Sequence, residues 1–184
     1  MTTFTTKTGI PLKIRLANPH DLTAIQKLNE KWTVVSLDIA DKENGFLYCE
    51  TYKEEDLIKI ISEEEVAVAT NNGQVIAYYI NDNYSQLLTQ YDNAIKNLKR
   101  EGIIFPYQKV SLRTQIVVEK EFHRMGIPSA MLFLMKPHLK QKYDLLFSIG
   151  INENPKRIAH QKAGWEIVYE NDFNYYCIYD LNKP

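Results

Sequence analysis

The chain reads Phe122-His123-Arg124-Met125-Gly126-Ile127-Pro128-Ser129-Ala130-Met131-Leu132 between a strand-like run, Ser111 to Val118, and an apolar helical pattern. A strand that turns directly into a helix predicts a cradle for an anion. The unpaired N–H groups of a helix's first turn and the positive end of its dipole favour a phosphate, and Gly126 lets the backbone approach it closely. The alternative is a purely structural turn, since many strand–turn–helix units bind nothing.

Length and composition predict one globular domain. The 184 residues are 45% hydrophobic and 24% charged, which is ordinary for a soluble protein. No apolar stretch approaches the roughly 20 residues that span a bilayer, and the first residues lack the apolar core of a secretory signal. We therefore expect a cytoplasmic protein that does not insert into membranes.

Charge and metal-binding residue types exclude several function classes. The net charge is −1, with no dominant basic block, so a nucleic-acid-binding surface is not expected. Cys49 and Cys177 lie far apart in apolar or aromatic surroundings, which predicts buried thiols. The four histidines have no metal-binding spacing, so no metal site is expected.

Hydrophobic periodicity and turn signals predict alternating strands and helices. Pro137 is expected to kink or divide its helix. The acidic run Glu63-Glu64-Glu65 is expected to be a solvated turn. The expected strands are Lys13–Leu16, Val66–Thr70, Gln74–Ile80, Ser111–Val118, Leu145–Ile151, Trp165–Tyr169 and Tyr175–Leu181. The expected helices are Asp21–Trp32, Tyr52–Ile61, an insertion at about 84–100, Gly126–Tyr143 and Asn154–Lys162.

This order of elements, together with local motifs, resembles the GNAT superfamily of N-acetyltransferases. The family's cofactor motif reads Arg/Gln-x-x-Gly-x-Gly/Ala after a strand. Here Gly126 matches the first glycine, whereas His123 stands where Arg or Gln is usual and Pro128 where Gly or Ala is usual. Near the C-terminus, the segment from Asn152 to Trp165 resembles the family's Asn…Ala-x-x-x-Tyr/His-x-Lys-x-Gly-Phe pattern.

The resemblance implies a single α/β domain of the α+β type, covering residues 1–184. Its sheet would be mixed and mainly antiparallel, with helices on both faces. The fourth and fifth expected strands, Ser111–Val118 and Leu145–Ile151, would splay apart to admit the pantetheine arm of a cofactor.

The resemblance also implies a reaction: transfer of an acetyl group from acetyl-CoA directly to a primary amine of a small molecule or a protein. Backbone groups of Val117 or Val118 would contact the pantetheine arm or the thioester, with ordinary sheet pairing as the alternative. Asn152 or Asn154 would bond the pantetheine amides, although Asn154 also suits a helix cap. The pyrophosphate would lie on the turn formed by His123, Arg124, Met125, Gly126 and Ser129.

His160 and Glu119 are the expected catalytic residues. His160 takes the place of a tyrosine that many members use as a proposed acid toward the departing thiolate. Glu119 follows the cofactor strand and could deprotonate the amine. A noncatalytic histidine and a solvated glutamate are the respective alternatives.

Other functions stay open at this stage. A CoA-binding sensor or interaction module with weak or no catalysis is favoured by the unusual Pro128 and His123. A third possibility is a structural protein without a cofactor. Sheet edges could support a homodimer, and the sequence names no acceptor.

Overall fold

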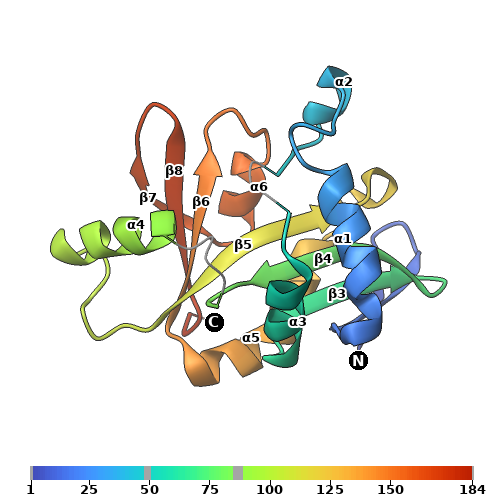
Figure 1. The fold of residues 1–184 in the computed structure, drawn as a ribbon, viewed down its shortest axis with the longest axis horizontal. Coiled ribbons are helices and arrows are strands. Elements are labelled where there is room, and N and C mark those ends of the chain that lie inside the picture. Colours follow the sequence, from blue (N-terminus) through green and yellow to red (C-terminus); the bar gives the residue numbers. More distant parts are fainter. Residues whose placement is uncertain (1, 48–50, 85–88, 184) are drawn as a thin grey trace.

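One eight-stranded sheet organises the chain (Figure 1), in a computed structural model that describes residues 2–47, 51–84 and 89–183. Its strand order is β1-β2-β3-β4-β5-β6-β8-β7, and every neighbouring pair is antiparallel except β5 with β6. The predicted mixed, mainly antiparallel sheet is confirmed. The strands are β1 (Thr2–Thr5), β2 (Pro11–Leu16), β3 (Val66–Asn71), β4 (Gln74–Asn81), β5 (Val110–Val118), β6 (Leu145–Ile151), β7 (Glu166–Glu170) and β8 (Asn174–Asp180).

Helices cover both faces of this sheet, as expected. Alternate side chains of β4 show why: Tyr78 packs into the core beneath α1 and α3, and Tyr79 packs into the core beneath α5. A third core, around Phe147, lies beneath α4. The helices are α1 (Leu22–Lys31), α2 (Ile39–Lys42), α3 (Glu54–Ser62), α4 (Thr89–Arg100), α5 (Ile127–Lys142) and α6 (Arg157–Lys162), with short 3₁₀ turns at η1 (Pro19–Asp21) and η3 (Lys120–Phe122).

The two halves of the sheet separate between β5 and β6. These parallel strands pair only from Val110–Leu112 to Leu145–Phe147; beyond that point they diverge toward their carboxyl ends (Figure 1). At the same place β5 carries a bulge, because Arg113 pairs with Asn81 and Gln115 with Ile80, so that Thr114 is the extra residue. The predicted splay is thus present.

Helix α5 runs without interruption through Pro137, so the expected division at this residue is wrong. Proline removes one N–H donor and leaves the carbonyl four residues earlier without its helical partner. That residue is Phe133, whose side chain is 81% exposed. The freed carbonyl therefore lies on the solvent side, where water can satisfy it.

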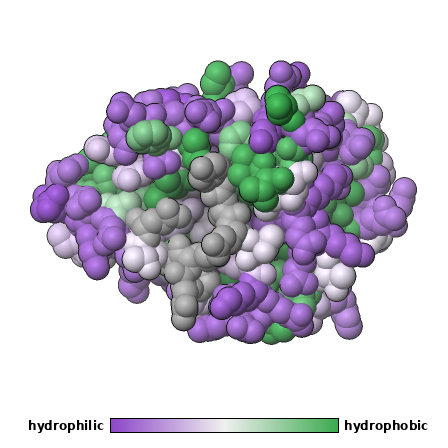
Figure 2. All heavy atoms as spheres, turned by 45° about the horizontal axis from the view of Figure 1, so that its top comes forward, coloured by the Kyte–Doolittle hydropathy of each residue, from purple (hydrophilic) through white to green (hydrophobic). Residues whose placement is uncertain are grey.

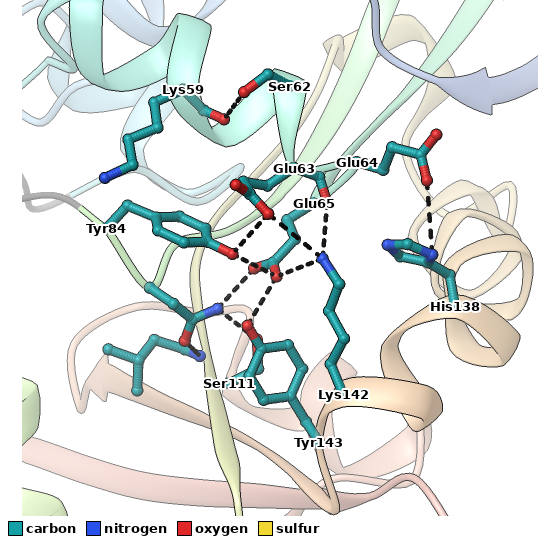
Figure 3. A network of polar contacts seen from close by, with 12 residues as sticks. Lys59, Ser62, Glu63, Glu64, Glu65, Tyr84, Ser111, His138, Lys142 and Tyr143 are labelled. Carbon is teal, nitrogen blue, oxygen red and sulfur yellow. Dashed lines mark hydrogen bonds and ion pairs between the residues drawn. The ribbon is translucent and has the colours of Figure 1, made fainter.

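Only part of the acidic run before β3 is the expected solvated turn: Glu63 and Glu64 lie in a turn with side chains 43% and 60% exposed, whereas Glu65 differs. Glu65 is fully buried, and its carboxylate accepts hydrogen bonds from Tyr143 (2.8 Å), Tyr84 (3.2 Å) and Asn83 (2.6 Å). Lys142, at the end of α5, lies 3.5 Å from the same carboxylate. Figure 3 shows Glu65, Tyr84, Lys142 and Tyr143 converging from the start of β3, the segment after β4 and the end of α5, which ties the end of α5 to the sheet.

Large hydrophobic side chains at the surface do not form one continuous field. The most exposed lie on different elements, and Figure 2 shows hydrophobic groups separated by hydrophilic ones on the side it displays. They are Val35, Ile39, Tyr107, Phe133 and Phe173. Within the described residues, no helix is long and apolar enough to cross a membrane.

Small residues on β6 make room for side chains that cross this strand. Gly150 pairs with Tyr175 of β8, and a Cβ atom at Gly150 would lie 2.1 Å from Cζ of Tyr175. The tyrosine ring therefore lies directly over Gly150. Cys177 likewise pairs with the small residue Ser148, and its thiol donates to the carbonyl of Ser148 at 3.6 Å.

We expect Gly150→Ala to destabilise the protein by about 2 kcal/mol or more, because the added methyl group collides with a ring that has no room to move. Urea unfolding of both proteins measures this difference. In a Tyr175→Leu background, which removes Cζ, the same substitution should cost much less. An equal cost in both backgrounds would show that the ring is not the cause.

Candidate functional site

The turn from β5 into α5 exposes a row of backbone donors. Arg124 and Gly126 both adopt positive φ, 63° and 81°, which folds the turn back before the helix starts at Ile127. Pro128 occupies the second helical position, where it removes one donor, and the bond from Ala130 N to Gly126 O (3.1 Å) follows. Among the described residues, no acceptor is found for the N–H groups of Arg124, Met125, Gly126, Ile127 and Ser129. The predicted anion cradle has this geometry.

Three basic side chains gather at this turn. Burial, followed by the nearby charge of Arg124, lowers the pKa of Lys156. Burial also lowers the pKa of His123, and Lys156 and Arg124 add to that effect. Within the described residues, neither Arg124 nor Lys156 forms an ion pair. The cluster is therefore suited to an anion of more than one charge.

Lys156 was not among the predicted site residues. It lies in the β6–α6 loop, and its aliphatic stem packs so closely on Gly45 that a Cβ there would be 2.7 Å from Cγ of the lysine. The basic pair of Lys156 and Arg157 beside Asn154-Pro155 was the available signal. Only the fold shows that this loop faces the turn after β5.

Of the two valines predicted to offer backbone groups to a cofactor, Val118 is the one whose backbone groups point into the splay. Glu119 donates its N–H to Ile76 O on β4 (2.9 Å). Since backbone groups alternate along a strand, those of Val117 also face β4, while those of Val118 face the splay. His123 confirms this direction, because its Nε2 bonds the carbonyl of Val118 at 2.8 Å. Val117 thus takes part in ordinary sheet pairing with β4.

A strap, defined as residues 38–47 and including α2, joins the two sides of the splay at its open end. On the β5 side, Asp41 pairs with Lys120 of η3 at 2.8 Å. On the β6 side, Nδ2 of Asn154 donates to the carbonyl of Phe46 at 2.9 Å. The oxygen of the same Asn154 side chain accepts from Lys156 N at 3.0 Å. Asn154 therefore has a structural role at both ends of its amide.

Asn152, the other predicted pantetheine ligand, is partly engaged. Its Nδ2 donates to the carbonyl of Asn171 at 2.6 Å. Its Oδ1 is buried and has no hydrogen-bond partner. A buried acceptor without a partner can be satisfied by a ligand amide, so the role of Asn152 as a pantetheine ligand stays a prediction.

His160 lies between two other polar side chains. Its Nε2 is 3.0 Å from Arg113 NH1, and its Nδ1 is 2.8 Å from the hydroxyl of Tyr175. Because a guanidinium can only donate, Nε2 is the acceptor and Nδ1 carries the proton. Burial, and then the charge of Arg113, lower the pKa of His160 to about 2. The imidazole is neutral near pH 7, and both nitrogens are occupied, so the predicted acid role would require breaking one of these bonds.

Glu119 is also engaged. Both of its carboxylate oxygens accept from Nζ of Lys31, at 2.8 and 2.6 Å. A carboxylate held in this way has to release the ammonium before it can take a proton from an amine. The predicted base role of Glu119 stays a prediction, with Lys31 as its competitor.

On the opposite face, the bulge residue Thr114 begins a short polar chain. Its hydroxyl lies 2.7 Å from that of Tyr52, which donates to the carboxylate of Asp82 at 3.0 Å. Burial and the charge of Asp82 raise the pKa of Tyr52. The sequence had placed Tyr52 only at the start of an expected helix, since neither the bulge nor its partners were foreseeable.

Among the residues that the structure describes, no three metal-ligating side chains are grouped together. The arrangement thus offers a turn with unpaired backbone donors beside a basic cluster, two strands that diverge, and polar groups on both faces of the inner end of the splay.

Comparison with solved structures identifies the fold. A GNAT-family acetyltransferase from Listeria monocytogenes matches with a TM-score of 0.65 at 16% identity, covering 97% of this chain and 99% of the other. The PaiA N-acetyltransferase of Thermoplasma acidophilum, solved with coenzyme A, matches at 0.62 and 12%, covering 92% and 98%. YncA of Salmonella typhimurium, a putative acetyltransferase solved with acetyl-CoA, matches at 0.60 and 11%, covering 94% and 95%. The sequence matches no family model and no curated protein.

The neutral, buried His160 should make folding pH-dependent. The ordinary histidine pKa is 6.5 and that of folded His160 is about 2, so below pH 6.5 the unfolded chain takes up a proton that the folded chain refuses. Stability from this group is complete above pH 6.5 and falls by about 2 kcal/mol between pH 7 and pH 5. Urea unfolding at both values tests this against His160→Gln, which should lose that part of the pH dependence. His20→Gln, on η1, is the control. Equal slopes in all three proteins would contradict the assignment.

Proposed function

We propose that this chain, which has the fold of the GNAT acetyltransferases, is an N-acetyltransferase that moves an acetyl group from acetyl-CoA to a primary amine. The observation that carries the proposal is the cradle around Gly126, where backbone donors without protein acceptors face a basic cluster at the open end of the splay. Acetyl-CoA has a diphosphate and a thin thioester arm, and both parts match what the site offers.

The residues of the site fit the cofactor in three ways. The N–H groups from Arg124 to Ser129, with Lys156, would hold the phosphates. The N–H of Val118 and the orphaned Oδ1 of Asn152 would bond the arm. From Val118 to Arg113 the strand advances five residues, about 17 Å, which is comparable with an extended pantetheine arm.

When bound, acetyl-CoA supplies an activated acyl group whose carbonyl carbon a neutral amine can attack. This chain would orient that group and exclude water from it. A backbone N–H at the inner part of β5 would stabilise the oxyanion that develops as the amine adds. The polar chain of Thr114, Tyr52 and Asp82 lies on the face from which an amine can approach.

The second candidate is a CoA-binding module with little or no turnover. It is favoured by one observation: the acid and the base suggested by the sequence, His160 and Glu119, are both tied to neighbouring side chains. Such a module would use the same cradle and the same arm site.

Substitution of the basic cluster tests the cofactor site. We expect acetyl-CoA to raise the thermal unfolding temperature of the wild-type protein. Arg124→Ala and Lys156→Ala should each weaken binding by about tenfold, because each removes a charge-assisted contact to phosphate. Lys27→Ala, an exposed position on α1, is the matched control. If acetyl-CoA causes no shift in the wild type even at millimolar concentration, the cofactor proposal fails.

Turnover tests the enzyme against the module. Release of free CoA thiol should accelerate when acetyl-CoA is mixed with an acceptor from a panel of primary amines and N-terminal peptides. Acetylated product identified by mass spectrometry confirms transfer to nitrogen. Tight binding of acetyl-CoA without thiol release across the panel would support the module instead.

A further inference from the structure

Arg113 is a buried arginine at the inner end of the splay. It immediately follows Leu112, the last residue of β5 that pairs with β6, and it is only 4% exposed. Its guanidinium reaches across β6 toward side chains of α6, of β8 and of the turn that follows α6. NH1 meets His160 on α6 at 3.0 Å, the guanidinium carbon lies 4.5 Å from the centre of the Trp165 ring, and Arg113 lies close enough to the thiol of Cys177 on β8 to act on its pKa.

The small residues of β6 allow this crossing. The strand presents Ser148 and Gly150 opposite Cys177 and Tyr175, and larger side chains there would fill the space under the splay. The guanidinium therefore lies at the inner end of the splay, next to the last residues of β5 and β6 that pair.

Among the described residues, no carboxylate pairs with Arg113. The groups that face it are neutral near pH 7: the His160 imidazole, the Cys177 thiol, the Trp165 ring and the phenols of Tyr175 and Tyr79. Its Nε is buried and has no hydrogen-bond partner. An arginine keeps its positive charge in proteins, so this is a fixed, unneutralised charge.

Two other buried charges in this protein lie beside an opposite charge. Asp21 pairs with Arg15 through two hydrogen bonds, at 2.6 and 2.8 Å. Glu65 lies 3.5 Å from Lys142. A lone buried cation destabilises a fold by several kcal/mol unless an anion compensates it, so Arg113 calls for an anion that arrives with a ligand.

We propose that Arg113 provides the positive charge that stabilises the thiolate of coenzyme A as it leaves the acetyl group, an inference that rests on the proposed function. An arm that starts at the Gly126 cradle and follows β5 ends beside Arg113, where β5 and β6 come together. The sulfur is the terminal atom of that arm. Arg113 is thus the cation nearest to the place where negative charge appears.

The proton and electron balance is simple. The amine nitrogen forms a bond to the carbonyl carbon, the carbon–sulfur bond breaks, and its electron pair stays on sulfur. Arg113 transfers no proton; it stabilises the thiolate electrostatically. The proton of the amine goes to solvent or to a base on the opposite face. His160, kept neutral by burial and then by the charge of Arg113, positions the guanidinium instead of protonating the sulfur.

The ionisation of bound coenzyme A tests this role without any acceptor. Coenzyme A labelled with ¹³C at the carbon next to sulfur reports thiolate formation through its chemical shift. In complex with the wild-type protein, we expect the thiol to ionise about one pH unit or more below free coenzyme A, as an opposite charge nearby requires. Arg113→Lys should preserve most of this change, and Arg113→Gln should abolish it.

The matched control is Arg100→Gln, which removes one positive charge from the exposed surface of α4 and should leave the bound thiol as in the wild type. If coenzyme A binds to the wild-type protein but its thiol ionises as in free solution, the role of Arg113 is refuted while the cofactor site stands. If coenzyme A does not bind at all, the proposed function fails first. An unshifted thiol in the wild-type complex refutes the role of Arg113 without any variant, so the test stays valid even if a variant does not fold.

Discussion

The short parallel pairing between β5 and β6 is the constraint on which the site depends. Three residues on each strand pair, from Val110–Leu112 to Leu145–Phe147, and then the bulge at Thr114 turns β5 away. Parallel strands are normally paired along their length and covered on both faces. Here the pairing stops, so the N–H of Val118 faces the splay while its carbonyl is bonded by His123.

The bulge also separates charge between the two faces of the sheet. Arg113 lies on the face of α5 and α6, among neutral groups, whereas Thr114 leads through Tyr52 to the buried carboxylate of Asp82 on the face of α1 and α3. A positive and a negative group thus flank the inner end of the splay from opposite sides. One inserted residue in β5 produces this polarity, which suits a reaction that leaves negative charge on one atom and a proton on another.

Much of the architecture could be predicted from the sequence. The Asn71-Asn72-Gly73 hairpin, the apolar strand Leu145–Ile151 and the glycine before α5 carry strong local signals, and their long-range arrangement followed from the family resemblance. The side-chain partners could not be foreseen. Nothing local shows that Lys31 holds Glu119, that burial and the charge of Arg113 keep His160 neutral, or that Glu65 is buried, because each depends on residues distant in the chain. Pro137 misled because its cost depends on whether the freed carbonyl meets water.

The strap restrains the splay at its outer end, which the sheet alone does not do. The two half-sheets are joined by strand pairing at the inner end, and residues 38–47 join them again at the outer end through Asp41–Lys120 and Asn154–Phe46. These two contacts restrain how far the half-sheets can separate at the outer end. If the proposed cofactor enters here, that restraint would favour a slender, unbranched arm over a branched one.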